Sequence, residues 1–205
     1  MKFEKLDIRK HSLKKVAELI YETDRDIFNF FYRNKANTAQ ILEKLIRTGK
    51  NNYGHEHIHV ITKDEKIMGI LLYSVGHHKL GDLKVLFKNL NIIDALRFLL
   101  IDLKDKLILS DLKKGDFYLA ALAVDEKVRR EGIGSTILNK AINMAHQRGC
   151  KRVVLDVALD NQKAKKLYER KGFRIFNKKI FPWFGRRIGM FNMELNIKTS
   201  PISIG

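Results

Sequence analysis

The pattern of apolar and polar residues predicts strands and helices that begin close to the N-terminus. Residues 3–9 alternate apolar with charged side chains, as an edge strand does, and Ser12 is a suitable N-cap for the amphipathic helix after it. The predicted elements here are a strand at 3–9, helices at 12–21 and 38–46, the second ended by Gly49, and hairpin strands at 58–62 and 66–74.

The pattern changes between residues 76 and 115, where leucine, isoleucine and phenylalanine recur at helical spacing. We expect one or two helices there, as an insertion lying against the main body. The predicted elements that follow are a strand at 117–124, a helix at 135–148, a strand at 152–157, a helix at 161–171, and strands starting at 173 and 187. Strands that alternate with helices through short connections predict a partly parallel sheet with helices packed on it.

Composition narrows the class of protein without naming its chemistry. The 205 residues carry 40 Lys and Arg against 23 Asp and Glu, a net charge of +17, and residues 125–205 hold 18 of the former against 7 of the latter. This excess favours an anionic partner, such as a phosphorylated cofactor, an acidic protein or nucleic acid. The single cysteine excludes an intramolecular disulfide framework.

The chain shows no internal repeat, no linker and no apolar run of the roughly 18 residues that a spanning helix needs. Charged residues occupy the positions where a signal peptide has its apolar stretch. We therefore expect one domain over residues 1–205, a cytoplasmic location and no membrane partner.

The connection between the strand at 117–124 and the next helix carries the first chemical signal. Gly132 and Gly134 lie where the helix starts, and Arg129 and Arg130 precede them. A helix N-terminus offers unpaired backbone N–H groups and a partial positive charge, so this segment can hold a phosphate or pyrophosphate. It is neither a dinucleotide fingerprint nor a Walker loop, and a tight turn that uses glycine for its geometry is the alternative interpretation.

A second motif further along the chain changes the weight of the first. Arg129-x-x-Gly132-x-Gly134 resembles the pyrophosphate signature of the GNAT superfamily of acetyl-CoA-dependent N-acetyltransferases. Asn161-x-x-Ala164-x-x-Leu167-Tyr168-x-x-x-Gly172-Phe173 resembles the second cofactor motif of that family. The close resemblance covers residues 116–174. It implies an α/β (α+β) fold with a mixed, mostly antiparallel sheet, a splayed parallel centre and helices on both faces, to which this chain adds the helical insertion at 76–115.

The resemblance also implies which residues bind acetyl-CoA, the co-substrate. The strand before the signature lines the pantetheine arm, and the Leu122 N–H faces the thioester oxygen, where negative charge develops during the reaction. The implied cofactor-binding residues are Leu122, Ala123, Val124, Arg129, Arg130, Glu131, Gly132, Ile133, Gly134, Ser135 and Asn161. No metal is expected, because direct transfer needs none.

Two side chains are implied as catalytic. Tyr168 matches the position that protonates the departing CoA thiolate, although its place in an apolar stripe also fits a core tyrosine. Asp156 stands where related ribosomal-protein acetyltransferases have a glutamate, and it interrupts an apolar strand. It is the candidate general base, and a structural aspartate bonded to nearby backbone is the alternative. Tyr118 occupies the position where other members place a base, but it is not a carboxylate.

The sequence therefore predicts an N-acetyltransferase that acts on a primary amine: a protein N-terminus, a lysine or a small amine. The surplus of positive charge suggests an acidic acceptor, such as a ribosomal or other acidic protein. An acidic pocket under the insertion would instead support a small amine. The competing hypothesis is a non-catalytic GNAT-like module that binds RNA or senses CoA through its basic C-terminal half; nucleic acid is not required by the main hypothesis.

Two further features have structural interpretations. His55, His57 and His59 would share one face of a strand, a spacing that can bind a metal but more often marks a polar strand edge. Residues 181–187 are predicted to form an aromatic and basic loop, either covering the end of the sheet or bordering the acceptor groove. Cys150 is expected to be a small buried residue.

Overall fold

In the computed structural model a seven-stranded sheet runs through the molecule in the order β1-β2-β3-β4-β5-β7-β6. The structure describes residues 1–76, 83–183 and 186–197. The strands are β1 (Lys2–Lys5), β2 (Ile58–Lys63), β3 (Lys66–Val75), β4 (Asp116–Val124), β5 (Arg152–Ala158), β6 (Arg174–Trp183) and β7 (Arg186–Asn196). Only β4 and β5 pair in parallel, and all other neighbours are antiparallel. This confirms the predicted mixed, mostly antiparallel sheet.

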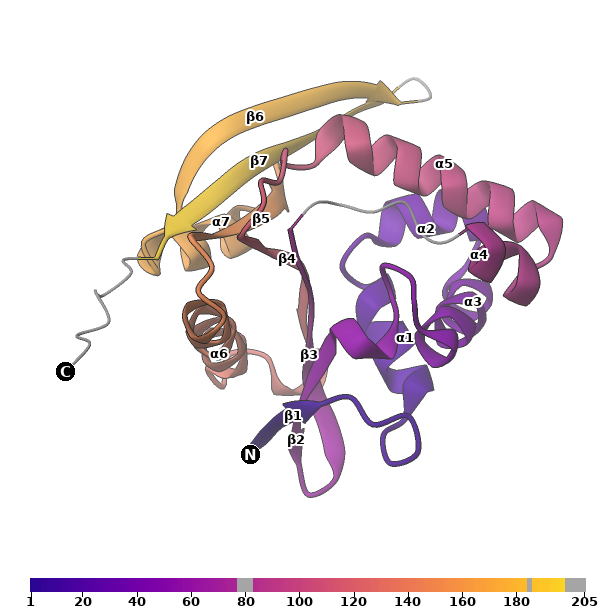
Figure 1. The fold of residues 1–205 in the computed structure, drawn as a ribbon, viewed down its shortest axis with the longest axis horizontal. Helices are drawn as coiled ribbons and strands as arrows, with labels where there is room; N and C mark the ends of the chain where they lie inside the picture. Colours follow the sequence, from indigo (N-terminus) through magenta and orange to yellow (C-terminus); the bar gives the residue numbers. More distant parts are fainter. Residues whose placement is uncertain (77–82, 184–185, 198–205) are drawn as a thin grey trace.

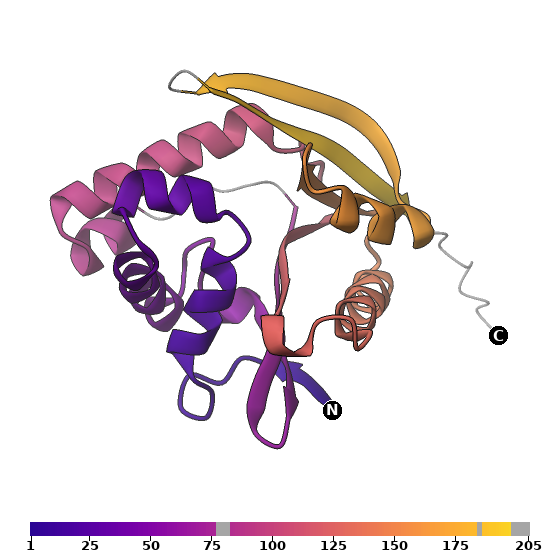
Figure 2. The ribbon, with the colours of Figure 1, turned by 180° about the vertical axis from the view of Figure 1, so that it is seen from behind.

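Helices cover both faces of the sheet, as predicted (Figures 1 and 2). One face carries α1 (Leu13–Tyr21), α2 (Arg25–Tyr32), α3 (Lys35–Thr48), α4 (Leu83–Asn89) and α5 (Ile92–Ile108), and the other carries α6 (Ile133–Gln147) and α7 (Gln162–Arg170). Two short 3₁₀ turns, η1 (His55–His57) and η2 (Glu126–Val128), complete the described elements. Each helical layer must bury an apolar stripe on the sheet, so the sheet has a core on each face.

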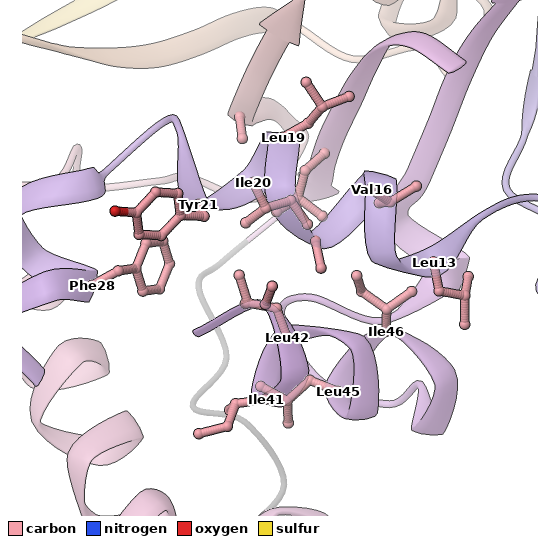
Figure 3. Packing of buried hydrophobic residues seen from close by; sticks show 14 of the residues in the cluster. Leu13, Val16, Leu19, Ile20, Tyr21, Phe28, Ile41, Leu42, Leu45 and Ile46 are labelled. Carbon is pink, nitrogen blue, oxygen red and sulfur yellow. The ribbon is translucent and has the colours of Figure 1, made fainter. Parts of the chain in front are cut away.

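The core on the first face is built mainly from α1 and α3. Ser12 caps α1 as predicted, its side chain accepting from the Lys15 N–H at 3.3 Å. Ile20 of α1 and Leu42 and Leu45 of α3 are buried, and Figure 3 shows the side chains of the two helices facing each other. Their apolar residues recur every three or four positions, which places them on one side of each helix.

The core on the second face lies between α6 and the centre of the sheet. Ile137 and Leu138 of α6 pack with Phe117 and Leu119 of β4, and all four are buried. Cys150 belongs to the same cluster, as predicted, and burial raises the pKa of its thiol. This packing fixes the start of α6 against the end of β4.

The predicted insertion is present as α4 and α5, between β3 and β4; its residues 77–82 lie outside the described part of the chain. Ala95, Phe98 and Ile101 of α5 are buried on the helical layer, and Phe98 meets Tyr53 edge-on with ring centroids 5.3 Å apart. Lys104 of α5 is also buried. The insertion therefore lies against the main body through one side of α5.

Four sequence-based predictions are wrong in detail. The sequence pattern predicts no helix between residues 22 and 37, where α2 and the first turn of α3 form. Ile27, Phe28, Phe31 and Tyr32 give α2 a short apolar face, but eight residues are too few for a clear period. The first strand ends at Lys5 rather than residue 9, because the Lys10 and His11 N–H groups turn back to the Asp7 carbonyl.

The histidines do not share one strand face. His55 and His57 lie in the turn η1, and only His59 lies on β2. The Nδ1 atom of His55 is 2.9 Å from the Ile46 carbonyl oxygen, so the ring bonds to α3 rather than to His57 or His59.

The aromatic and basic segment is mostly strand rather than loop. Phe181 and Trp183 belong to β6 and pair with Ile188 and Arg186 of β7, while residues 184–185 lie outside the described part. Pro182 is tolerated in β6 because β6 is an edge strand, where one side needs no backbone donor.

Candidate active site

The two parallel strands at the centre of the sheet are held together at one end and separate at the other. Arg152 donates from Nε and Nη2 to the Asp116 carboxylate, at 2.8 Å each, where β4 and β5 begin. Pairing continues to Leu119 and Leu155 and then stops, although β4 runs on to Val124 and β5 to Ala158. Ala120 has no partner in β3, where the register shifts, so β4 carries a bulge at this point. The predicted splay is present.

The register of β4 on β3 decides which backbone groups face the gap between β4 and β5. The Asp125 N–H donates to the Met68 carbonyl, which makes this a hydrogen-bonded pair of the antiparallel ladder. Hydrogen-bonded pairs alternate with pairs that are not, so Ala123 bonds to β3 whereas Leu122 and Val124 direct their N–H and C=O groups the other way. The Val124 carbonyl accepts from the Nε of Arg129 at 3.3 Å, which agrees with this direction. The Leu122 N–H therefore faces the gap.

The start of α6 has the geometry of an anion-binding site. Gly132 is its N-cap with φ of 78°, a conformation that favours glycine, and the helix begins at Ile133, two residues before the predicted start. The Thr136 N–H is the first to bond back along the helix, to the Gly132 carbonyl at 3.0 Å. The N–H groups of Ile133, Gly134 and Ser135 precede that bond and have no acceptor within the helix.

The side chains of residues 129–134 differ in whether they are buried in the core or exposed to solvent. The Ile133 side chain is buried in the core, so only its backbone can serve a ligand, whereas Arg129, Arg130 and Glu131 are exposed. A Cβ atom at Gly134 would lie 3.6 Å from a Val124 methyl and 3.9 Å from a Leu122 methyl. The first turn of α6 therefore packs directly against the walls of the gap.

A cleft of about 580 Å³ opens from this gap, and α7 borders it. Leu122, Ala123, Val124, Arg129 and Asn161 all line it. The Asn161 Oδ1 caps α7 by accepting from the Ala164 N–H at 3.1 Å, which leaves its Nδ2 as the atom that can donate to a ligand. Five of the eleven predicted cofactor-binding residues therefore line the cleft, and the other six, residues 130–135, lie outside its lining, in the loop and first turn of α6.

Tyr168 lies on α7, half-buried, and lines the same cleft. Its ring is tilted against that of Phe173, with centroids 5.8 Å apart. Burial raises the pKa of Tyr168 to about 12, so the phenol stays protonated throughout the neutral range. The residue is both part of an apolar cluster and in reach of the cleft, so the two interpretations of the sequence are compatible.

Asp156 lies on β5 just beyond the last parallel pair, and its carboxylate accepts four hydrogen bonds. Ser110, two residues after α5, donates from its backbone N–H at 3.1 Å and from its hydroxyl at 2.6 Å. Tyr118 donates its hydroxyl at 2.9 Å, and Asn192 of β7 donates its amide. Three different elements therefore hold one carboxylate at the edge of the cleft.

Tyr118 connects this carboxylate to the cleft, which it also lines. Burial raises the pKa of Tyr118 well above its ordinary value, and the charges of Asp156 and Asp105 raise it further. Its hydroxyl is therefore a neutral donor to Asp156. Because Tyr118 is not a carboxylate, the sequence pattern does not predict it as the base, and no motif points to Ser110 or Asn192. Their link to Asp156 arises only from the fold.

The other end of the cleft is acidic. Glu22, Asp24, Asp102 and Asp105 line it, the last two from the inserted helix α5. Buried Lys104 pairs with Asp24 at 3.1 Å and Asp105 at 2.7 Å. Burial lowers the pKa of Lys104, but the charges of Asp105 and Asp24 outweigh it and the pKa is raised, so the ammonium is charged. Burial also raises the pKa of both aspartates.

The remaining observations bear on metals and membranes. Within residues 1–76, 83–183 and 186–197, no three His, Cys, Asp or Glu side chains come together as a metal site would require. None of the helices in those ranges is long and apolar enough to cross a bilayer.

Residues 18–173 match the model of the acetyltransferase (GNAT) family. A stretch of 78 residues, 38% of this chain, is 38% identical to human N-alpha-acetyltransferase 30 and spans 21% of the length of that protein.

Solved structures share the fold at low sequence identity. An N-acetyltransferase from Staphylococcus aureus Mu50 has a TM-score of 0.75 at 16% identity, with 95% of this chain and 100% of that one covered. The NatC complex bound to Gag peptide and CoA has a TM-score of 0.56 at 15% identity, covering 96% and 98%. These likenesses support the predicted fold. The match to the family model supports acetyl-CoA as the co-substrate. Because the family model matches most of the chain, the protein belongs to the acetyltransferase (GNAT) family.

Proposed function

We propose that the chain transfers an acetyl group from acetyl-CoA to a primary amine. The observation that carries this proposal is the Leu122 N–H, which faces the gap between β4 and β5, beside the unpaired N–H groups that open α6. One group is placed for the acyl oxygen and the others for the diphosphate. Membership of the acetyltransferase family supports the same assignment.

The residues that would hold acetyl-CoA follow from this arrangement. The backbone N–H groups of Ile133, Gly134 and Ser135 hold the diphosphate, Arg129 adds charge, and Asn161 donates from Nδ2. Bound acetyl-CoA supplies the acyl group as a thioester. The Leu122 N–H stabilises negative charge that develops on the acyl oxygen, an interaction stronger in the transition state than in the ground state.

The acceptor amine is an ammonium ion near neutral pH and must lose a proton before it can react. We assign the uptake of that proton to Asp156. Both of its oxygens are occupied by donors of this chain, so the proton reaches it through Tyr118. The Tyr118 oxygen accepts a proton from the amine while its own proton passes to Oδ2 of Asp156, and the phenol remains neutral.

Tyr168 is placed to return a proton at the other end of the reaction. It donates to the departing thiolate and recovers a proton from solvent. A thiol has a pKa near 8.5, so a phenol with a pKa of about 12 donates less readily than an ordinary tyrosine would. Burial also keeps Tyr168 protonated throughout the neutral pH range.

We propose the N-terminus of a peptide as the acceptor. Several relatives, 32% to 38% identical over 56 to 78 residues, are called N-alpha-acetyltransferases, and the aligned NatC structure contains a bound peptide. A peptide N-terminus has a pKa near 8, so it loses its proton more easily than a lysine side chain. A buried relay with a single carboxylate suits that acceptor.

One observation favours a second candidate, a small polycationic amine. Five carboxylates, those of Glu22, Asp24, Asp102, Asp105 and Asp156, line the cleft, against three cations, those of Lys104, Arg129 and Lys163. A cleft that is locally negative in a chain of net charge +17 favours a cationic ligand.

The test is the release of free CoA from acetyl-CoA, measured with matched acceptors. One peptide is supplied with a free N-terminus and again with that N-terminus already acetylated, both containing an internal lysine, and a linear polyamine is the third acceptor. We expect turnover with the free peptide and none with the blocked one. Turnover of the polyamine alone would select the second candidate, and equal turnover of both peptides would select lysine.

The same assay, combined with binding measurements, also tests whether the chain is an enzyme. Binding of CoA by calorimetry without turnover of any amine would overturn the proposed activity and favour a module that senses CoA. Binding of RNA that weakens steeply with salt, in the same absence of turnover, would favour the RNA-binding alternative.

A further inference from the structure

Helix α5 is apolar on two opposite sides. Ala95, Phe98 and Ile101 are buried against the helical layer. On the other side lies what we call the outer stripe: Ile93, Leu96, Leu100, Leu103 and Leu107, which are 57%, 51%, 49%, 54% and 48% exposed. Both ribbon views place α5 at the outer edge of the helical layer (Figures 1 and 2). A helix that is apolar all round is normally covered on all sides.

The spacing of the outer stripe indicates what covers it. Its residues are separated by three, four, three and four positions, the a and d pattern of a coiled-coil seam. A row of apolar residues at this spacing supplies the knobs of knobs-into-holes packing. A single exposed apolar residue would need no explanation, but five such residues in one row indicate an interaction surface. The stripe fits another helix.

The charges beside the outer stripe select the kind of helix. Arg97 and exposed Lys106 flank the stripe on its two sides. On α4, which contacts α5, exposed Phe87 lies between Lys84 and Lys88, which are also exposed. Arg97 is itself paired with Asp94 at 3.1 Å, and Asp105 pairs with Lys104, so the positive charge beside the stripe comes mainly from Lys106 and from the lysines of α4.

A second copy of this chain would bring the same cations against themselves, on top of a net charge of +17. An acidic partner would meet them with opposite charge. We propose that the outer stripe of α5 binds an acidic amphipathic helix of a partner protein, with leucine-like residues in the seam and glutamate or aspartate beside it.

This surface is separate from the active site. Asp102 and Asp105, on the sides of α5 away from the outer stripe, line the cleft, whereas no residue of the stripe does. Binding and catalysis can therefore be measured independently, and variants in the stripe leave the release of CoA unchanged.

The experiment uses the full chain and a synthetic helical peptide of about three heptads, with Leu at a and d and Glu at e and g. Repulsion between the glutamates keeps this peptide from pairing with itself. A matched peptide carries Lys in place of Glu. We expect calorimetry to show binding of the Glu peptide at least about ten-fold tighter than binding of the Lys peptide, a difference that shrinks as salt is raised.

Variants distinguish binding at the outer stripe from non-specific hydrophobic binding elsewhere on the surface. Leu100→Gln with Leu103→Gln should weaken binding of the Glu peptide at least about ten-fold, because the seam loses two knobs at its centre. Ile180→Gln on β6 is the matched control, because this side chain is 43% exposed and lies outside the stripe. It should change the affinity for the Glu peptide by less than about two-fold. If the double variant is poorly folded by circular dichroism, Leu96→Gln with Leu107→Gln replaces it.

Four results would overturn the proposal: equal binding of both peptides, no binding of either, a loss of affinity in Ile180→Gln as large as in the double variant, or a dimer of the chain alone by light scattering that the stripe variants dissolve. Binding to phosphatidylserine vesicles that depends on the stripe, with no binding of the Glu peptide, would assign the surface to a membrane instead.

Discussion

Asp156 shows how the surroundings of a residue redefine a role assigned from its type. As a carboxylate in an apolar strand it is a candidate base, yet Ser110, Tyr118 and Asn192 occupy both of its oxygens. Hydrogen bonds of this kind fix the orientation of the group. A base held in this way works through a neighbour, and Tyr118 is the neighbour that reaches the cleft.

The role of Asp156 predicts a defect that depends on the acceptor's own ionisation. Asp156→Asn should lower kcat about 100-fold near neutral pH, where the amine is charged, and Tyr118→Phe should do the same. Above the pKa of the amine the acceptor is already neutral, so the defect should shrink. Steady-state rates from pH 6.5 to 9.5 measure this.

The matched control is Asp160→Asn, because Asp160 is an exposed carboxylate on the turn that follows β5. It should behave like the wild type at every pH. A pH profile of Asp156→Asn that parallels the wild type would remove Asp156 from proton transfer.

Tyr168 predicts a different signature, because it acts on the leaving group. Tyr168→Phe removes the hydroxyl and keeps the ring packed on Phe173, so affinity for CoA should stay within about two-fold while kcat falls about 100-fold. Since the pKa of Tyr168 is about 12, the residue loses its proton only near that pH. The pH dependence of kcat below pH 10 should therefore have the same shape in the wild type and in Tyr168→Phe. An unchanged kcat would leave Tyr168 as a core residue alone.

Gly132 allows a test of the anion site with an internal control. Gly132 and Gly149 both have positive φ, 78° and 67°, and a Cβ at either position meets nothing within 4 Å. Alanine at each should therefore cost a similar free energy of unfolding, about 1 kcal/mol. Only Gly132→Ala should also weaken CoA binding, because only Gly132 sets the direction of the α6 N–H groups. Equal CoA affinity in both variants, measured by calorimetry, would contradict the assigned site.

At the scale of elements, α5 joins the helical layer to the cleft through one buried cation. Lys104 is 2% exposed and holds Asp24, the residue before α2, and Asp105 of its own helix. Ser110, just after the same helix, bonds to Asp156. The inserted helix therefore contributes to the acceptor end of the cleft and to the catalytic carboxylate.

Lys104→Met should lower the free energy of unfolding by about 1–3 kcal/mol at pH 7. This is less than the loss for a fully buried pair, because both aspartates are partly solvated. The folded-state pKa values of Asp24 and Asp105 are raised, so the folded protein binds protons more tightly than the unfolded chain, and the variant should recover stability as pH falls from 7 towards 4.

In the wild type the pKa of Lys104 is raised, so its contribution is complete below pH 10.5 and is lost as pH rises above that value. Lys106→Met is the matched control, since Lys106 is exposed on the same helix and should change little. Urea unfolding at pH 7 and pH 4.5 measures both variants. A Lys104→Met variant that is as stable as Lys106→Met at pH 7 would show that the ion pairs do not hold α5.

At the scale of the whole molecule, the surface and the cleft have opposite charge. The net charge is +17, whereas the acceptor end of the cleft is lined mostly by carboxylates. Long-range attraction or repulsion acts on the rate of encounter and is screened by salt, whereas contacts inside the cleft are screened much less.

This arrangement predicts salt effects of opposite sign. When salt is raised from about 50 to 300 mM, where the screening length falls well below 10 Å, kcat/KM should fall for a peptide acceptor with acidic residues beyond its N-terminus. It should rise or stay level for a polyamine, and a peptide of no net charge is the control. The same direction of change for all three would show that the surface charge does not steer the acceptor.

Much of the fold and part of the site follow from local patterns in the sequence. The strands and helices from β4 to α7 agree closely with their prediction, because long periodic segments with glycine at their ends leave little choice. Helix α2 was missed because eight residues give too short a period, and the histidines were misplaced because a 3₁₀ turn and a strand end look alike in sequence.

The sequence by itself determined the glycine-rich start of α6, because it depends on residues a few positions apart whose backbone geometry is local. Only the tertiary structure decided that Tyr118, Ser110 and Asn192 meet at Asp156, that α5 makes the acceptor end of the cleft acidic, and that its outer stripe faces solvent. These contacts join residues from 36 to 46 positions apart around Asp156. No period or motif records them, because they are set by how the layers pack.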